Sequence, residues 1–152
     1  MRVTEPLTAL PEALHTALQT ESFVLLHTTD AESGKPTSNA ISWVYAVNPN
    51  RLRFAVDGRS RLVANLSAKP EASVTVFAAG SVYAVYGLTN LVTEALDEVP
   101  FKLVCFDIEI SDVRDAMFYG ARLSVAPEYE KTYDKRAADK LDGQVFAAMK
   151  KA

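Results

Sequence analysis

Residues 51–70 read RLRFAVDGRSRLVANLSAKP, and this stretch predicts a strand, a tight turn and a helix in close succession. The strand covers residues 52–56, the turn is Asp57-Gly58, and the helix opens at Ser60. A serine hydroxyl at this position accepts a hydrogen bond from a backbone N–H of the first helical turn. Three apolar residues then recur at spacings that give the helix one buried face: Leu62, Val63 and Leu66.

Two arginines, Arg59 and Arg61, flank the positive end of this helix dipole. A cation there is disfavoured by a few tenths of a kcal/mol up to about 1 kcal/mol. A bound anion would remove the conflict, because free N–H groups, a serine hydroxyl and guanidinium groups all suit phosphate. Two solvated arginines near a helix start are the alternative, and the residues alone leave both interpretations open.

The composition is that of an ordinary globular chain. Its 152 residues, 49% hydrophobic and 23% charged, predict a single domain. A net charge of −3 argues against a nucleic-acid partner, because no basic stripe exists to neutralise a phosphate backbone. The one cysteine, Cys105, excludes an intramolecular disulfide and suits a reducing cytoplasmic location.

Neither a signal peptide nor a membrane span is expected. The first residues carry Glu5 and Glu12 and lack an unbroken apolar run. Residues 72–93 contain no charge and are long enough to cross a bilayer, but glycine-containing turns interrupt them. Their β-branched and aromatic residues predict two strands joined by a turn.

Taken in order, the patterns predict a mostly β protein with flanking helices. Leucines at helical spacing predict a helix over residues 7–20, and a charged helix is expected over residues 127–151. Six or so consecutive antiparallel strands favour a closed barrel, because closure removes unprotected edges. Besides 52–56, the strands are predicted at residues 23–28, 37–47, 72–79, 82–92 and 101–110, with a short one at 116–119. The predicted organisation is one domain over 1–152, with an N-terminal helix in 1–21, the barrel in 22–120 and the C-terminal helix in 127–151.

Most standard catalytic groups are absent. His15 and His27 lack a metal-ligand or triad context and are interpreted as structural. Cys105 is interpreted as a packed strand thiol. Asp107 and Glu109 fall on one face of the strand at 101–110, and an outward polar face explains them better than acid–base catalysis.

The run at 53–70 resembles the flavin-phosphate signature of the pyridoxamine 5′-phosphate oxidase-like, FMN-binding split-barrel superfamily. In that pattern a strand leads to a Ser-Arg-Lys triplet at a helix start, which here reads Ser60-Arg61-Leu62. The segment TSNAISWVYAV (37–47) resembles the family strand beside the isoalloxazine ring, and SVYAVYG (81–87) resembles a later barrel strand.

This resemblance implies a six-stranded split barrel that forms a homodimer, with two FMN sites at the subunit interface. Ser60 and Arg61 would hold the FMN phosphate with Arg59 as a helper, and Val56 and Asp57 would lie near the ring or ribityl chain. The segment beside the isoalloxazine would consist of Asn39, Ala40, Ile41 and Ser42. Three aromatic residues could wall the pocket or instead form core or dimer contacts: Trp43, Tyr83 and Tyr86.

Departures from the pattern argue against pyridoxamine phosphate as the substrate. Leu62 replaces a phosphate-binding lysine, and neutral residues replace basic ones on the strand at 37–47. The C-terminal segment also lacks the arginine- and histidine-containing substrate motif of the true oxidases. An FMN-dependent oxidoreductase acting on an unassigned small molecule or electron donor is therefore expected. A non-catalytic module that binds or senses FMN or haem, and a structural dimer with a vestigial pocket, remain alternatives.

Overall fold

The computed structural model describes residues 7–152 of the chain. Residues 1–6, at the start of the predicted N-terminal helical region, lie outside the described residues. The described elements, in chain order, are α1 (Glu12–Ala17), β1 (Val24–Thr29), β2 (Pro36–Ile41), β3 (Val44–Asn48), β4 (Arg51–Asp57), α2 (Arg61–Ala68), β5 (Glu71–Ala78), β6 (Ser81–Thr93), β7 (Leu103–Asp115) and α3 (Lys135–Lys151).

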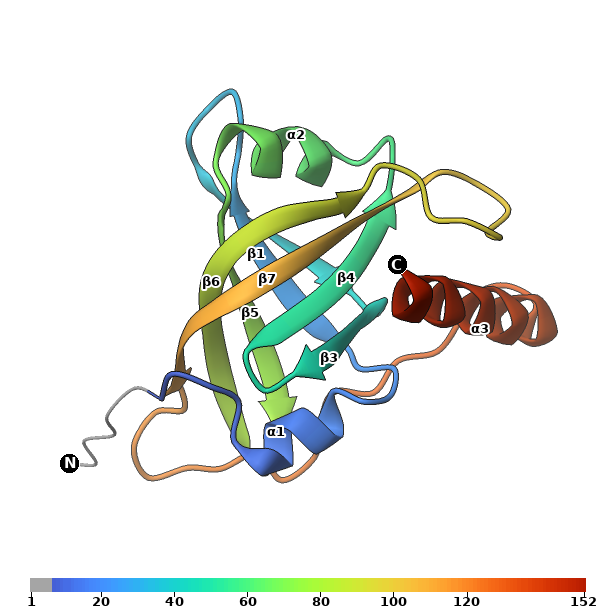
Figure 1. Cartoon of the computed structure of the whole chain (residues 1–152). Coiled ribbons are helices and arrows are strands. Elements are labelled where there is room, and N and C mark those ends of the chain that lie inside the picture. Colours follow the sequence, from blue (N-terminus) through green and yellow to red (C-terminus); the bar gives the residue numbers. More distant parts are fainter. Residues whose placement is uncertain (1–6) are drawn as a thin grey trace.

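The strands form one curved antiparallel sheet in the order β2-β1-β5-β6-β7-β4-β3. Strands β6 and β7 each have 13 residues. They are long and bent, and the sheet curves with them like part of a barrel (Figure 1). Helix α2 lies over one end of this curved sheet and α1 lies near the other end (Figure 1). The mostly β antiparallel fold predicted from the sequence is confirmed.

The prediction of six strands and a closed barrel was wrong, because the sheet has seven strands and its two edges, β2 and β3, do not pair. The predicted strand at 37–47 is in fact two strands, interrupted at Ser42 and Trp43. Its first half pairs with β1, ending at the partners Val24 and Ile41, whereas its second half pairs with β4. The chain therefore changes its partner strand from β1 to β4 across Ser42 and Trp43, and the sheet stays open between β2 and β3.

Three other predicted boundaries differ from the structure. Helix α1 begins after Pro11, and Leu7 instead forms a β-bridge with Val113. Residues 116–119 do not form a strand, since β7 itself continues to Asp115. Helix α3 begins only after Asp134, whose side chain accepts a hydrogen bond from the Ala137 N–H at 3.1 Å and caps the helix.

The main core fills the concave side of the sheet. Alternate residues of β1, β5 and β7 point into it, as the period of a strand requires. Phe54 and Phe106 stack at its centre with 5.5 Å between ring centroids. The apolar residues of α2, and those in and directly flanking α1, complete this core: Leu62, Leu66, Leu10, Leu14 and Leu18.

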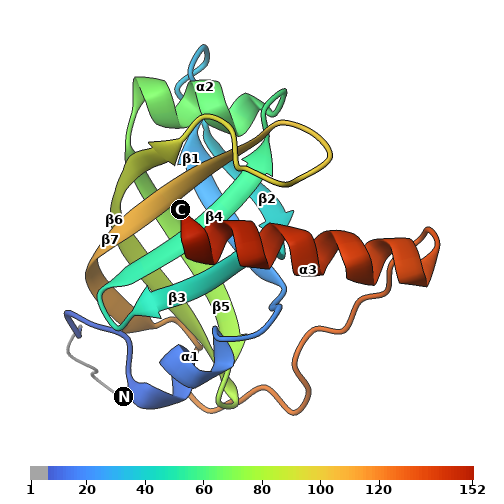
Figure 2. The same ribbon diagram turned by 45° about the vertical axis from the view of Figure 1, so that its right-hand side comes forward.

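A second core lies on the opposite face of β4 and β7, where α3 packs across the sheet (Figure 2). Val145 and Met149 of α3 are fully buried there. The outward polar face predicted for Asp107 and Glu109 was therefore wrong for Asp107, which is buried beneath α3, whereas Cys105 is packed there as its interpretation as a buried thiol predicts. Only Glu109 is exposed, where it pairs with Arg51.

Candidate functional site

A cavity of about 340 Å³ lies where the open edge of the sheet meets α2. The end of β2, the crossing to β3, the end of β4 and the start of α2 supply its walls. Its lining is mainly apolar or neutral and comprises Asn39, Ala40, Ile41, Ser42, Trp43, Ala55, Val56, Asp57, Ser60 and Leu62. The break in the strand at Ser42 and Trp43 therefore helps to form the cavity.

A second cavity of about 350 Å³ adjoins the first at the start of α2. The two cavities share Asn39, Ser60 and Leu62, so they form neighbouring parts of one groove. The remaining lining of the second cavity is more polar and consists of Asp30, Thr37, Ser38, Arg61 and Asn65. The groove thus has a largely neutral part and a polar part.

The start of α2 agrees with the turn at Asp57-Gly58 and the helix start at Ser60 that were predicted from the sequence. The Ser60 hydroxyl accepts a hydrogen bond from the Leu62 N–H at 3.2 Å and caps the helix. Leu62 and Leu66 are buried in the main core, which fixes the helix axis against the sheet. Helix α2 therefore directs its N-terminal end, which carries the positive end of the dipole, toward the polar cavity.

A buried polar network holds α2 against the β1–β2 hairpin. The Asn65 amide donates to the Thr28 hydroxyl at 3.1 Å, and its carbonyl oxygen accepts from the Ala31 N–H at 2.9 Å. The Thr28 and Thr37 hydroxyls are 2.8 Å apart, which extends the network to β2. Because buried polar groups are costly when unpaired, these contacts make the polar cavity rigid.

Each arginine at the start of α2 has a carboxylate partner in the structure. Arg61, whose side chain is 76% exposed, donates to Asp30 at 2.5 Å. Arg59, 92% exposed, donates to Asp57 at 3.1 Å and lines neither cavity. The protein itself therefore supplies part of the negative charge that the arginine pattern calls for.

Both carboxylates have pKa values below the ordinary range. Hydrogen bonds from the backbone and side chain of Ser33 lower the pKa of Asp30, and the charge of Arg61 adds to this. The hydrogen bond from the Arg59 side chain lowers the pKa of Asp57 and raises that of Arg59. Both acids are therefore ionised at neutral pH and do not serve as general acids there.

The structure brings together every predicted site residue except Arg59. Arg61 lines the second cavity. The other seven line the first: Asn39, Ala40, Ile41, Ser42, Val56, Asp57 and Ser60. Among the aromatic candidates, Trp43 lines the first cavity, whereas Tyr83 and Tyr86 lie on β6 and line neither.

Sequence reasoning missed several residues of the polar cavity. Asp30 lies in a segment of turn-forming residues, which explained it without a functional role. Thr37 and Ser38 lie near the start of a strand, and their polar side chains did not indicate a binding site. Asn65 interrupts the apolar face of α2, and a polar residue at a buried helix position was the one signal that could have marked it.

The histidines and the cysteine occupy structural positions. His27 bonds to the hydroxyls of Ser38 at 2.9 Å and Thr75 at 2.7 Å, and His15 contacts Gln19. Burial raises the pKa of the Cys105 thiol to about 12, so it stays protonated and unreactive. Across residues 7–152, no group of three or more His, Cys, Asp or Glu side chains could hold a metal ion.

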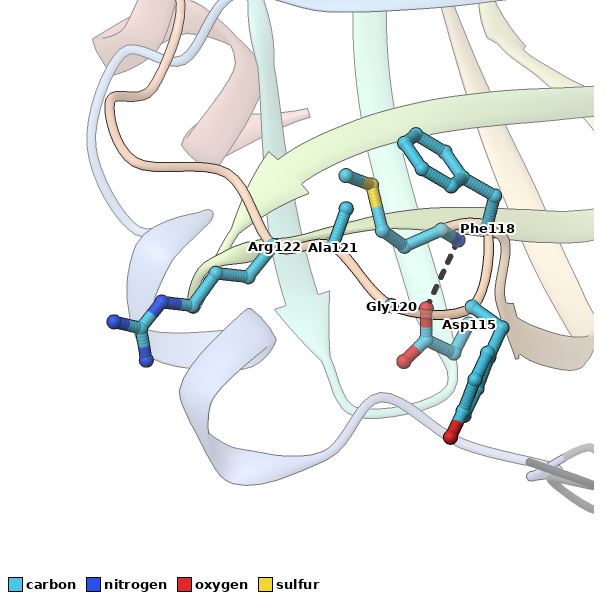
Figure 3. Close-up of a pocket in the computed structure, with 7 residues that line it drawn as sticks. Asp115, Phe118, Gly120, Ala121 and Arg122 are labelled. Carbon is cyan, nitrogen blue, oxygen red and sulfur yellow. Dashed lines mark hydrogen bonds between the residues drawn. The ribbon is translucent and has the colours of Figure 1, made fainter. Parts of the chain in front are cut away.

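A larger cavity of about 600 Å³ lies in the segment that follows β7 (Figure 3). One stretch of chain, from Asp115 to Arg122, supplies its lining. Asp115 accepts hydrogen bonds from the Ser81 hydroxyl at 2.8 Å and the Met117 N–H at 3.0 Å. These bonds shape the turn out of β7, and the lining does not include residues of the groove beside α2.

The fold and the groove define a split barrel with a cavity at the open edge of the sheet. The chain belongs to the pyridoxamine 5′-phosphate oxidase family, whose sequence model matches residues 10–107. The resemblance drawn from residues 37–47 and 53–70 is thereby confirmed. Helix α3 lies outside the matched residues.

Solved structures with the same fold come from several kinds of protein. An F420 reductase, 20% identical, has a TM-score of 0.58 over 69% of this chain and 98% of its own. A candidate pyridoxamine 5′-phosphate oxidase from Lactobacillus delbrueckii, 14% identical, has a TM-score of 0.59 over 71% of this chain and 99% of its own. An FMN-binding protein from Syntrophomonas wolfei subsp. wolfei, 17% identical, has a TM-score of 0.51 over 69% of this chain and 82% of its own. No curated protein sequence matches the chain.

Helices that could span a membrane were also sought among the described residues. None of them combines the length and apolar character that a bilayer crossing requires.

Proposed function

We propose that the protein is a single-domain FMN-binding flavoprotein, an oxidoreductase that acts on a small-molecule substrate or electron donor. The observation that carries this proposal is the groove beside α2. Its neutral part joins directly to a polar part at a helix N-terminus. FMN has the same two parts, a flat ring system and a phosphate.

The neutral cavity suits the isoalloxazine ring. Ala40 and Ile41 of β2 line it together with Ala55 and Val56 of β4, and Trp43 adds an aromatic wall. Such a lining offers apolar contact to a flat ring, and the backbone of the β2 edge offers hydrogen-bonding groups. FMN supplies hydride or electron transfer when it is bound, and the protein supplies position and electrostatics. Asp57, the carboxylate in this lining, is paired with Arg59 and its pKa is lowered, which makes it a weak base and fits this division of work.

The polar cavity suits the phosphate. Ser60, the N-terminal end of α2 and Arg61 provide a hydroxyl, backbone N–H groups and a cation. Arg61 uses only one guanidinium nitrogen for Asp30, so its other N–H groups can bind a phosphate oxygen. Asp30 itself opposes an anion, which predicts a weaker phosphate site than one lined by cations alone.

Oxidation of pyridoxamine phosphate is not part of the proposal. Leu62 stands where the true oxidases carry a phosphate-binding lysine, and it is buried in the main core. Leu62 lines both cavities, but its apolar side chain supplies no cation to the groove. The proposed cofactor site is therefore separable from the substrate chemistry of those enzymes.

The proposal includes a homodimer with cofactor sites at the subunit interface. The groove is open to solvent along the sheet edge, where Asn39 and Ala40 are exposed. Strand β6 also exposes apolar side chains, including Leu88 and Leu91, which suit a protein interface. Light scattering coupled to size-exclusion chromatography measures the assembly, and a monomer at micromolar concentration would contradict this part.

A non-catalytic binding module is the second candidate. The Arg61–Asp30 pair favours it, because a cradle that is electrostatically satisfied without a phosphate suits a ligand that binds and leaves, as sensing requires, better than a permanently held cofactor. For haem as the ligand, neither cavity of the groove has a histidine, cysteine or methionine in its lining to serve as an axial ligand. The lining therefore favours FMN over haem.

The first experiment is a visible absorption spectrum of the purified protein, recorded before and after FMN is added and excess is removed by desalting. Two retained flavin bands support the proposal, and their bleaching by a reduced nicotinamide supports an oxidoreductase over a binding module. A Soret band would support haem. A colourless protein that releases all FMN would overturn the proposal.

Arg61→Ala tests the position of the phosphate. The variant should weaken FMN binding by about 1.5–3 kcal/mol, the scale of a charge-assisted hydrogen bond left unmade. Arg59→Ala is the matched control. It removes the same charge two residues before Arg61, and the Arg59 side chain lines neither cavity. Fluorescence titration with FMN measures both. Equal losses for the two variants would mean that net charge, and not contact at Arg61, controls the affinity.

A further inference from the structure

We infer that Asp142 of α3 is a positioning residue for Trp43, so that the C-terminal helix sets one wall of the cofactor cavity. The structural part of this inference stands on contacts within the chain. Its consequence for a ligand rests on the proposed FMN function.

The contact between the two residues is direct. The Trp43 indole N–H donates to the Asp142 carboxylate at 2.9 Å, across 99 residues of sequence. Trp43 also lines the neutral cavity, and its ring lies 6.4 Å from that of Phe101. The nitrogen edge of the indole is thus held by α3, which orients the ring at the cavity wall.

Asp142 is itself held in place by a second contact. Its other carboxylate oxygen lies 2.5 Å from the Lys131 ammonium, which also contacts Glu21 at 2.7 Å. The Lys131 and Asp142 side chains are largely buried. One carboxylate oxygen therefore accepts from Trp43 and the other from Lys131, and the two contacts together fix the orientation of the carboxylate.

The position of Asp142 within α3 is unusual for a residue that serves only stability. It shares a helix face with Ala138, Val145 and Met149, which are all buried and lie four, three and seven residues away. A leucine at this position would continue the apolar face. A carboxylate there requires partners, and the Lys131 ammonium and the Trp43 indole N–H provide them.

Helix α3 is well anchored at its other end, so it can serve as a fixed support. Arg53 of β4 donates to the carbonyl oxygens of Met149 at 2.9 Å and Ala152 at 2.8 Å. Because α3 lies outside residues 10–107, this support is an addition to the part of the chain that the family model matches. The cavity wall at Trp43 therefore depends on a segment that the family pattern does not include.

The test uses Trp43 as its own reporter, since the sequence contains one tryptophan. Asp142→Leu removes the acceptor while keeping an apolar helix face, and Asp142→Asn keeps an acceptor oxygen. Asp139→Leu makes the same chemical change at an exposed position of α3 and serves as the control. Emission maximum and acrylamide quenching are measured without ligand, and FMN affinity is then measured by titration.

Asp142→Leu should red-shift the emission, increase quenching and weaken FMN binding about three- to tenfold, the scale of one net hydrogen bond. Asp142→Asn keeps one acceptor oxygen but places an amide NH2 group at the other position, so it should restore part of both properties, and Asp139→Leu should match the wild type. Unchanged emission in Asp142→Leu would overturn the inference. Altered emission with unchanged FMN affinity would overturn its consequence for the site. A wild type that binds no FMN would instead overturn the proposed function, a result that the ligand-free emission keeps distinct.

Discussion

Replacing Arg53 with methionine should destabilise the protein strongly, because Arg53 forms a buried ion pair and also bonds to the end of α3. The Arg53 guanidinium bonds to Asp107 at 2.6 and 3.0 Å, and both side chains are only 10% exposed. The hydrogen bond to Asp107 raises the pKa of Arg53, so its guanidinium stays charged throughout the working pH range. Arg53→Met leaves the Asp107 carboxylate buried with only the more distant Arg51 guanidinium, 3.9 Å away, and removes the donor to the Met149 and Ala152 carbonyls at the C-terminal end of α3.

Breaking a buried pair in this way costs about 3–5 kcal/mol. Urea unfolding followed by far-UV circular dichroism measures the loss, with an unchanged m-value as the sign that the same surface is exposed on unfolding. A loss below about 1 kcal/mol would refute the reasoning, because it would mean that Asp107 finds water or another partner at no cost.

The double variant Arg53→Met/Asp107→Leu separates the two contributions. Removing both charges should recover much of the stability lost in Arg53→Met, because the uncompensated buried charge is gone. The residual loss, about 1–3 kcal/mol, reports the helix carbonyls of Met149 and Ala152 left without a donor. A double variant less stable than the single one would contradict the assignment of the cost to an unpaired carboxylate.

Three smaller perturbations follow from the same structure. Gly87→Ala should destabilise the protein by about 1–3 kcal/mol in urea unfolding, because the added Cβ would overlap the backbone carbonyl of Glu109 on β7. Gly143→Ala should raise stability by about 0.5–1 kcal/mol, since the new Cβ on α3 meets nothing within 4 Å. Because hydrogen bonds from Ser33 lower the pKa of Asp30 below its usual 3.8, its contribution is present above that value and lost on acidification. The difference in Tm between wild type and Asp30→Asn should therefore shrink from about pH 5 to about pH 3, and a constant difference would contradict the ionic role of Asp30.

Much of the fold and part of the groove could be predicted because their signals are local. The strand, turn and capped helix at residues 51–70 depend on neighbours in sequence, and Ser60 caps α2 as its position predicts. The alternation in β1 and β5 likewise reflects the period of a strand with one face in the core.

The remaining features depend on contacts that are distant in sequence. Residues 37–47 are β-prone throughout, so nothing local marks the change of partner at Ser42. The alternation of β7 was correctly assigned, but its second face became a core because α3 covers Cys105 and Asp107. The contact from Trp43 to α3 spans 99 residues and leaves no pattern in either segment.

The crossing between β2 and β3 has a consequence for how such a site changes over time. Strand β2 pairs with β1 on one side, so its other edge offers main-chain N–H and C=O groups to whatever lies in the groove. Recognition by main-chain groups survives substitution of the side chains that surround it. Mutations at residues 39–43 are therefore expected to alter which molecule the groove accepts while leaving a common binding frame, which allows one barrel to acquire new chemistry at low sequence identity.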